Sequence, residues 1–92
     1  MAFPTDPAGQ LRTEKALLIK ADKDIVDGRQ RLRNQQHLLE DLHAGGHDST
    51  QAERLVVLLE QTLMEWERHR VLIEERVAYL ERQTHPEGFL GR

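Results

Sequence analysis

The chain has 92 residues, of which 32% are charged and only 4% aromatic, and its formal net charge is −3. A chain of this length forms one domain at most, and this composition is typical of long helices rather than of a β-sandwich or an α/β domain. Cysteine is absent, which excludes a disulfide framework, a thiolate metal site and a cysteine nucleophile.

The first nine residues contain Pro4 and Pro7, two of the three prolines of the chain, and we expect residues 1–9 to form a flexible arm. They lack the basic start and the apolar core of a signal peptide. No apolar run approaches the length of a membrane span. We therefore expect a soluble cytoplasmic protein that makes no use of a membrane.

An apolar residue then returns every seven positions, which predicts one long helix over about residues 10–44. These positions are Leu11, Leu18, Ile25, Leu32 and Leu39. The companion positions of the same repeat carry smaller or polar residues. They are Glu14, Ala21, Gly28, Gln35 and Leu42. Gly28 lowers helix propensity, so it either makes space for a facing side chain or marks a slight bend or neutral change.

A turn is expected at residues 45–48, where two consecutive glycines can supply the left-handed conformation that ends a helix. Three residues that follow can accept hydrogen bonds from the free amides of the next helix. They are Asp48, Ser49 and Thr50. Two capping boxes are compatible with this segment, Asp48 with Gln51 and Thr50 with Glu53.

The second helix is predicted over about residues 49–84, because apolar residues recur there at alternating spacings of three and four, which is the hydrophobic seam of a coiled coil. The seam consists of Val56, Leu59, Leu63, Trp66, Arg70, Ile73, Val77 and Leu80. Only Arg70 interrupts its apolar character. Pro86 disfavours continuation of the helix, and residues 85–92 are expected to form a flexible tail.

Two long helices joined by a short turn pack as antiparallel neighbours, so the predicted fold is an all-α, coiled-coil-like two-helix hairpin. Folding about the turn brings Gly28 opposite Leu63 and Trp66, so that large residues meet a small one. A register displaced by three or four residues would instead place Trp66 against Ile25. The predicted hairpin and dimer interface consists of the seam residues of the second helix together with five residues of the first. These five are Leu18, Ile25, Gly28, Leu32 and Leu39.

A second set of apolar residues lies outside the seam. Its members are Leu55, Leu58, Leu72 and Tyr79 on the second helix and Leu17, Val26 and Leu38 on the first. A lone hairpin leaves these side chains without cover, and pairing two hairpins into an antiparallel four-helix bundle would bury them. We therefore expect a homodimer, with a higher oligomer or a different protein partner as alternatives.

Arg70 occupies a seam position that favours an apolar side chain. A polar seam residue sets the pairing of helices, and its guanidinium can reach Asp24, Asp27 or Glu74. The alternative is an arginine inside a bundle that binds an anionic ligand or partner.

The histidines offer a weak metal pattern. Glu40 and His43 have the Glu-x-x-His spacing of carboxylate-bridged di-iron bundles, and Glu65 lies one helical turn from His69. A di-iron site needs two such motifs and two further glutamates, whereas the chain has one motif, beside the turn. The sequence also lacks a nucleophile elbow and a phosphate-binding loop. We expect no catalytic, cofactor or metal site, and hence no enzyme.

The densest basic segment contains Arg29, Arg31 and Arg33. Alternate residues of a helix point in nearly opposite directions, so only Arg29 and Arg33 share a face. A solvated charged surface is the expected role. Nucleic-acid binding by these arginines of the first helix is the alternative.

Three segments resemble a set of small, uncharacterised bacterial helical proteins. They are residues 24–32 (DIVDGRQRL), 38–42 (LLEDL) and 46–52 (GHDSTQA). Those proteins are similar in having an acidic residue before a glycine inside the first helix, a Gly-His-Asp-Ser/Thr turn and a Leu-rich second helix. The resemblance implies a helical hairpin and no established activity. It favours Asp48 or Ser49 as the cap and leaves the role of His47 open.

The sequence therefore predicts a non-catalytic interaction or regulatory module. It would associate with itself and bind an unidentified protein partner through its helix faces. The alternative is a small helical bundle that binds nucleic acid through the first helix.

Overall fold

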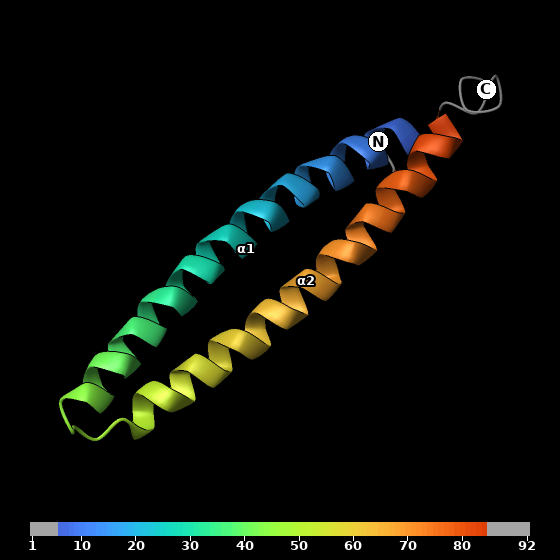
Figure 1. Cartoon of the computed structure of the whole chain (residues 1–92). Coiled ribbons are helices and arrows are strands. Elements are labelled where there is room, and N and C mark those ends of the chain that lie inside the picture. Colours follow the sequence, from blue (N-terminus) through green and yellow to red (C-terminus); the bar gives the residue numbers. More distant parts are fainter. Residues whose placement is uncertain (1–5, 85–92) are drawn as a thin grey trace. The chain divides into compact units, whose positions relative to one another are not determined.

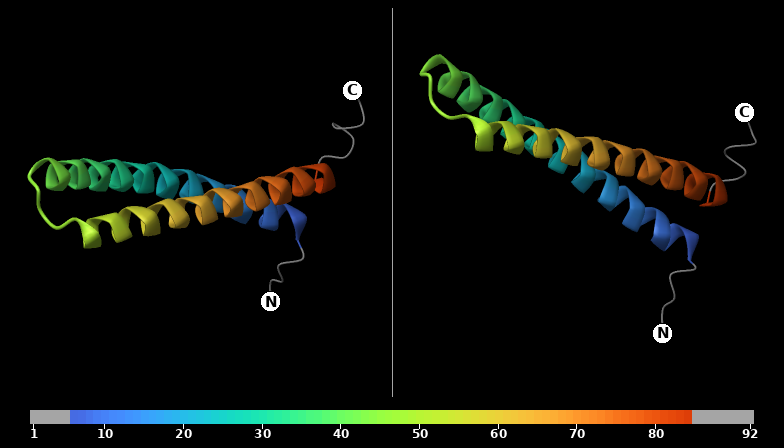
Figure 2. Two further views of the ribbon diagram at one scale, coloured as in Figure 1. Left: turned by 60° about the horizontal axis from the view of Figure 1, so that its bottom comes forward. Right: turned by 90° about the horizontal axis from the view of Figure 1, so that it is seen from below.

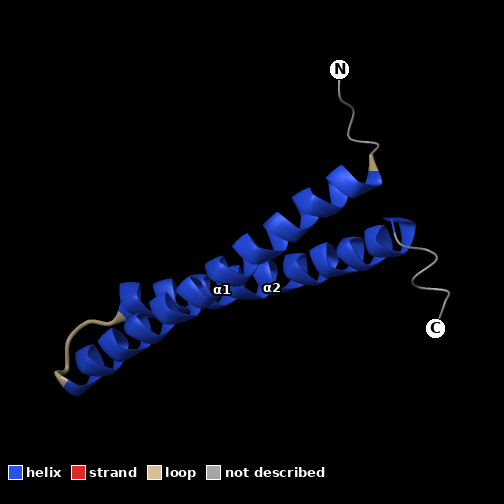
Figure 3. Ribbon diagram, turned by 90° about the horizontal axis from the view of Figure 1, so that it is seen from above, coloured by secondary structure: helices blue, strands red, loops and turns tan. Residues whose placement is uncertain are grey.

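The computed structural model describes residues 6–84, which form two α-helices joined by a short connection (Figure 1). Helix α1 spans Pro7–Ala44 and α2 spans Thr50–Thr84. No strand occurs among the described residues (Figure 3), and the all-α class is confirmed. Neither helix carries an apolar stretch that could cross a bilayer. The expected tail at residues 85–92 and the first five residues of the expected arm lie outside this range.

Helix α1 begins at Pro7 rather than near Gln10, so residues 7–9 are helical and do not belong to the expected arm. Asp6 is the N-cap. Its carbonyl accepts a hydrogen bond from the Gln10 amide at 2.9 Å, and its carboxylate accepts one from the Ala8 amide at 3.2 Å. Proline is favoured directly after an N-cap, because its fixed φ suits the helix and the missing N–H has no partner there.

Helix α1 ends in a Schellman motif centred on Gly46. The Gly46 amide donates to the His43 carbonyl at 3.1 Å, and the His47 amide donates to the Leu42 carbonyl at 2.9 Å. Gly46 has a φ of 70°. This left-handed conformation strains any residue with a Cβ, so the glycine here has the helix-ending role that the sequence predicts.

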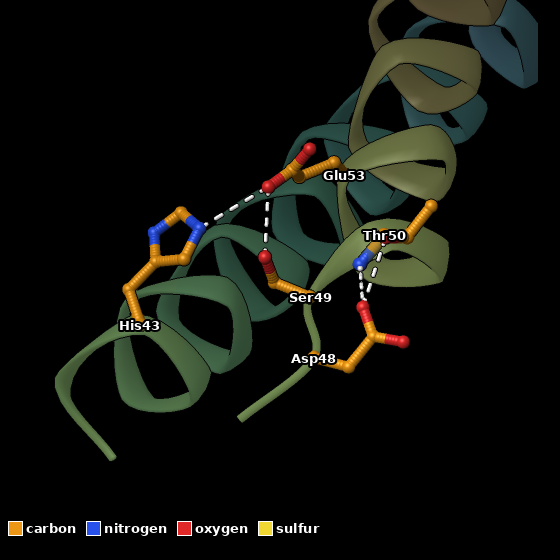
Figure 4. A network of polar contacts seen from close by, with 5 residues as sticks. All are labelled: His43, Asp48, Ser49, Thr50 and Glu53. Carbon is orange, nitrogen blue, oxygen red and sulfur yellow. Dashed lines mark hydrogen bonds and ion pairs between the residues drawn. The ribbon is translucent and has the colours of Figure 1, made fainter. Parts of the chain in front are cut away.

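Helix α2 begins at Thr50, and Asp48 supplies its side-chain cap (Figure 4). The Asp48 carboxylate accepts hydrogen bonds from the Thr50 amide at 3.1 Å and from the Thr50 hydroxyl at 2.9 Å. Glu53 does not complete the expected box with Thr50. Its carboxylate instead accepts a hydrogen bond from the Ser49 hydroxyl at 2.8 Å. Among the three candidates, Asp48 therefore supplies the side-chain cap, while the Ser49 carbonyl accepts the first backbone hydrogen bond of α2, from the Glu53 amide at 2.9 Å.

The chain divides into two compact units, and each contains one segment of each helix. We call residues 23–68 the turn unit. The described residues of the other unit, 6–22 and 69–84, form the end unit. Each unit is considered by itself below.

In the turn unit the helices lie side by side and run antiparallel (Figure 2). Arg29 of α1 pairs with Glu67 of α2 at 2.7 Å, and His43 pairs with Glu53 at 3.2 Å, so numbers on α1 rise as those on α2 fall. The buried core side chains are Ile25, Val56 and Leu63. The other predicted seam residues of this unit are half-buried; they are Leu32, Leu39, Leu59 and Trp66.

Gly28 is buried in the turn unit, where it faces Leu63 and Trp66 of α2. A Cβ at this position would lie 2.9 Å from Leu63 Cδ2 and 3.1 Å from Trp66 Cζ3. Both distances are shorter than ordinary van der Waals contacts. The helices pack as they do because residue 28 lacks a side chain, and the expected pairing of Gly28 with Leu63 and Trp66 is confirmed. Trp66 is not displaced to the register facing Ile25.

In the end unit the core consists of Leu11, Ile73 and Leu80, with Leu18 and Val77 half-buried beside them. Ile73 is the most deeply buried, with 2% of its surface exposed. Three ion pairs link the helices of this unit, one of them the pair of Arg70 with Asp22 that is described below. Lys15 lies 3.4 Å from Glu81, and Arg76 donates to Glu14 at 3.0 Å. These contacts are again antiparallel.

Arg70 lies in the end unit and bridges two carboxylates. Its guanidinium binds Asp22 across the helices and Glu74 one turn along α2, the latter at 3.0 Å. The Glu74 contact is as expected. The partner on α1 is Asp22 rather than Asp24 or Asp27, because the antiparallel register brings Asp22 level with Arg70.

We expect Arg70→Leu to remain folded, with an unfolding midpoint equal to or above that of the parent chain. Partly exposed ion pairs stabilise little, whereas leucine suits a seam position. Thermal unfolding followed by circular dichroism measures this. Arg76→Leu, which removes an exposed ion pair outside the seam, is the control and should give no increase. A large loss of stability in Arg70→Leu alone would show that the bridge itself holds the end unit together.

Candidate interaction surface

The most prominent surface feature of the described residues is exposed apolar side chains on both helices. On α1 they are Leu17, Ile19, Val26 and Leu38, and on α2 they are Leu55, Val57, Leu58, Met64, Val71, Leu72 and Tyr79. All seven residues that the sequence places outside the seam are exposed. Ile19, Val57, Met64 and Val71 extend this set.

On α2 most of these residues share one side. Successive helical residues are turned by about 100°, so the residues one and two positions after Val56, Leu63, Arg70 and Val77 lie on the side opposite the seam. We define the outer face of α2 by Val57, Leu58, Met64, Val71, Leu72, Ala78 and Tyr79, all of them exposed. Glu65 is the one polar residue at these positions. Leu55 lies off this face, beside the seam.

Polar residues run along the middle of the outer face at spacings of seven. They are Arg54, Gln61, Arg68, Glu75 and Arg82. Among the described residues, neither Arg68 nor Glu75 forms an ion pair or a hydrogen bond, whereas Glu67 and Arg76 on α2 both pair with α1. The charges of Glu67 and Arg76, which flank the seam, are therefore matched within the chain, and those of Arg68 and Glu75 on the outer face are not.

The exposed apolar residues of α1 form no comparable face. Leu17 and Leu38 share one heptad position, and Ile19 and Val26 share another that is turned away from the first. The two pairs do not merge into one stripe. The outer face of α2 is therefore the strongest candidate for contact with another molecule.

A polar network surrounds the turn. The Glu53 carboxylate accepts a hydrogen bond from the Ser49 hydroxyl and lies 3.2 Å from Nε2 of His43 (Figure 4). The Ser49 contact, followed by that of His43, lowers the pKa of Glu53 below its ordinary value. Two hydrogen bonds from Thr50 likewise lower the pKa of Asp48. The network ties the end of α1 to the start of α2.

We expect Asp48→Ala to lower the melting temperature at neutral pH, because the Thr50 amide loses its cap. The folded-state pKa of Asp48 is lowered, so its stabilisation is complete above the ordinary pKa and is lost as the pH falls through the lowered value. The difference between Asp48→Ala and the parent chain should therefore shrink on acidification. Asp48→Asn is the matched control, because its neutral oxygen caps at any pH. A difference that is independent of pH would contradict this role for the carboxylate.

The described residues of the weak metal pattern do not form a cluster that could bind a metal ion. The ring of His43 points toward Glu53, and Glu40, Glu65 and His69 are exposed. Within residues 6–84, no group of three or more His, Asp or Glu side chains is arranged to hold a metal ion.

The three arginines of the basic segment are exposed, and two have partners within the chain. Arg29 pairs with Glu67, and Arg33 donates a hydrogen bond to the Gln30 side chain at 2.7 Å. The charge of Arg29 is thus balanced by a carboxylate from α2. This leaves less unopposed positive charge for a phosphate backbone than the sequence of α1 alone indicates.

The fold and its surface define a two-helix all-α protein with a polar turn and one apolar outer face. Comparisons with protein-family models, curated proteins and solved structures find no match to this chain.

Proposed function

We propose that the protein is a non-catalytic helical interaction module, which associates with a second copy and binds a protein partner through its exposed helix faces. The outer face of α2 carries this proposal. Contiguous apolar residues on a protein surface are typical of docking sites, and an amphipathic helix binds such a face through residues spaced by three, four and seven.

Self-association would place four helices in one assembly. A two-fold dimer is the commonest closed arrangement of identical chains, because each copy offers the same surface to the other. Two hairpins joined through the apolar outer faces place the helices in a row, with the two copies of α2 in the middle, because the outer face lies opposite the seam. The exposed set on α1 would then remain available to a different protein. The four-helix bundle that the sequence predicts, which would also bury the exposed set on α1, is a different arrangement.

A protein partner fits this surface better than a nucleic acid. Binding to a phosphate backbone requires several unopposed cations on one face. The outer face of α2 has two rows of apolar residues, its arginines Arg54, Arg68 and Arg82 are spaced fourteen residues apart, and Arg29 on α1 already has a carboxylate partner. Helix-to-helix recognition is therefore the function that the exposed residues support best.

Sedimentation equilibrium over a wide range of protein concentration tests self-association. We expect Leu72→Gln, on the outer face, to weaken association while the helical circular dichroism signal stays the same. The matched control is Leu38→Gln on α1, because the two leucines are 48% and 45% exposed. A single species of 10.7 kDa at every concentration would contradict self-association. Equal effects of the two variants would show that the outer face of α2 is not the surface used.

A further inference from the structure

We propose that His43 and Glu53 form a pH-sensitive contact, which joins the end of α1 to the start of α2 more firmly when the imidazole is charged. Both residues belong to the turn unit, and Nε2 of His43 lies 3.2 Å from Oε2 of Glu53 (Figure 4). Histidine is the side chain whose charge ordinarily changes near neutral pH. The proposal concerns the stability of the turn unit and does not depend on self-association.

Glu53 presents a negative charge to this imidazole. It lies in the first turn of α2, where the helix dipole favours a carboxylate. The Ser49 hydroxyl donates a hydrogen bond to the same oxygen, Oε2, at 2.8 Å. That hydrogen bond, followed by the contact with His43, lowers the pKa of Glu53 below its ordinary value. Glu53 is therefore ionised over the whole pH range in which a histidine changes its charge.

The position of His43 also favours a charged ring. It lies in the last turn of α1, and its carbonyl accepts the Gly46 amide in the Schellman motif. A cation near the C-terminal end of a helix is stabilised by the carbonyl groups that end there. A charged imidazole thus interacts favourably both with the end of its own helix and with the carboxylate of the next one.

Other titratable or charged residues lie near this pair along the chain. They are Glu40 and Asp41 on α1, His47 and Asp48 in the connection, and Arg54 on α2. Among the described residues, none of these five forms an ion pair. The Asp48 carboxylate caps Thr50, and a Cβ on Gly45 would lie 2.7 Å from Cδ2 of His47, so the His47 ring lies against that glycine. Glu53 is therefore the carboxylate that pairs with His43.

The contact should stabilise the turn unit most at mildly acidic pH. An imidazole is ordinarily charged below about pH 6.5 and neutral above it. Neutral His43 can still donate a hydrogen bond from Nε2, but the ionic attraction to Glu53 is lost. The stabilisation is thus complete in mild acid and declines as the pH rises through neutrality. It is also lost in strong acid, because Glu53 then takes up a proton.

A double-mutant cycle at two pH values tests the contact in the full-length chain. The variants are His43→Gln, Glu53→Gln and the two combined. Glutamine at residue 53 keeps an oxygen for the Ser49 hydroxyl and removes only the charge. Urea unfolding followed by Trp66 fluorescence reports on the turn unit at about pH 5.5 and about pH 8.5, on either side of the ordinary imidazole pKa.

We expect His43→Gln to raise the unfolding equilibrium constant about two- to fivefold at the lower pH, as for a partly exposed ion pair. The increase should be smaller at the higher pH. It should also be smaller in the Glu53→Gln background, because the partner charge is already absent there. The cycle cancels the interaction of His43 with the end of α1, which the two backgrounds share.

Two further variants separate charge from other effects. His43→Lys carries a positive charge at both pH values, so its stability relative to His43→Gln should be the same at both. His37→Gln is the matched control. It removes an exposed histidine from α1 in the same unit, and this histidine has no ion-pair partner among the described residues. We expect no pH-dependent change in its unfolding constant relative to the parent chain.

The outcomes distinguish an ionic contact from a neutral one. A coupling between residues 43 and 53 that is larger at the lower pH would support the proposal. The same coupling at both pH values would overturn it, because a neutral hydrogen bond predicts that result. A loss in His43→Gln that is unchanged in the Glu53→Gln background would also overturn it, since the charge would then act only on the end of α1.

Discussion

Replacing Ile73 by alanine should lower the free energy of unfolding by about 2–5 kcal/mol, the range for truncating a fully buried aliphatic side chain. Ile73 is the most deeply buried side chain, and it lies in the core of the end unit with Leu11 and Leu80. Its loss removes apolar burial and leaves a cavity between two helices. For a chain of this size, such a loss is a large part of the total stability. Urea unfolding followed by circular dichroism measures the effect.

Ile19→Ala is the matched control for this substitution. It makes the same chemical change in the same unit, at a residue that is 71% exposed. We expect a change within about 0.5 kcal/mol, as for most surface substitutions. Equal losses from the two variants would show that the core of the end unit is not organised around Ile73.

Replacing Gly28 by leucine should destabilise the turn unit by about 1–3 kcal/mol, the usual effect of overpacking. Even a Cβ at this position would lie 2.9 Å from Leu63 and 3.1 Å from Trp66. The larger side chain must therefore displace one of them or part the helices. Leucine also favours the helix by about 1 kcal/mol relative to glycine. A net loss in urea unfolding would accordingly show that the steric effect outweighs propensity.

A double-mutant cycle assigns the effect to this contact. Leu63→Ala alone should cost about 2–5 kcal/mol, because Leu63 is a buried core residue. Combined with Gly28→Leu it should cost less than the two single losses together, since the new leucine can occupy the vacated space. Strict additivity would contradict close packing of residue 28 against Leu63.

The heptad pattern predicts most of the fold, because the packing of the two helices depends mainly on which apolar residues avoid water. Every predicted seam residue in the described range is buried or half-buried, and Arg70 is among the half-buried ones. The pairing of Gly28 with Leu63 and Trp66 follows from the position of the turn alone. The start of α1 is different, since prolines were interpreted as a break. The Asp6-Pro7 dipeptide is in fact a start signal, in which aspartate caps and proline takes the first helical position.

The contacts of charged residues are less predictable than the core, because long side chains have several partners within reach. Arg70 can reach several carboxylates of α1. A small change in the register of the two helices decides whether its partner is Asp22, Asp24 or Asp27. The outer face of α2 was only partly predicted, through Leu58, Leu72 and Tyr79. Its remaining members recur every seven residues, and this spacing is the signal in the sequence that indicates them. They are Val57, Met64, Val71 and Ala78.

The contact between Trp66 and Gly28 also gives the protein an intrinsic optical probe. Trp66 is the single tryptophan of the chain, so fluorescence reports on the turn unit, whereas circular dichroism reports on both helices throughout. In Ile73→Ala the substitution lies in the other unit. Coincident fluorescence and dichroism transitions would mean that the whole chain unfolds as one cooperative system. A fluorescence transition at a higher denaturant concentration than the dichroism transition would mean that the turn unit unfolds as a separate cooperative unit.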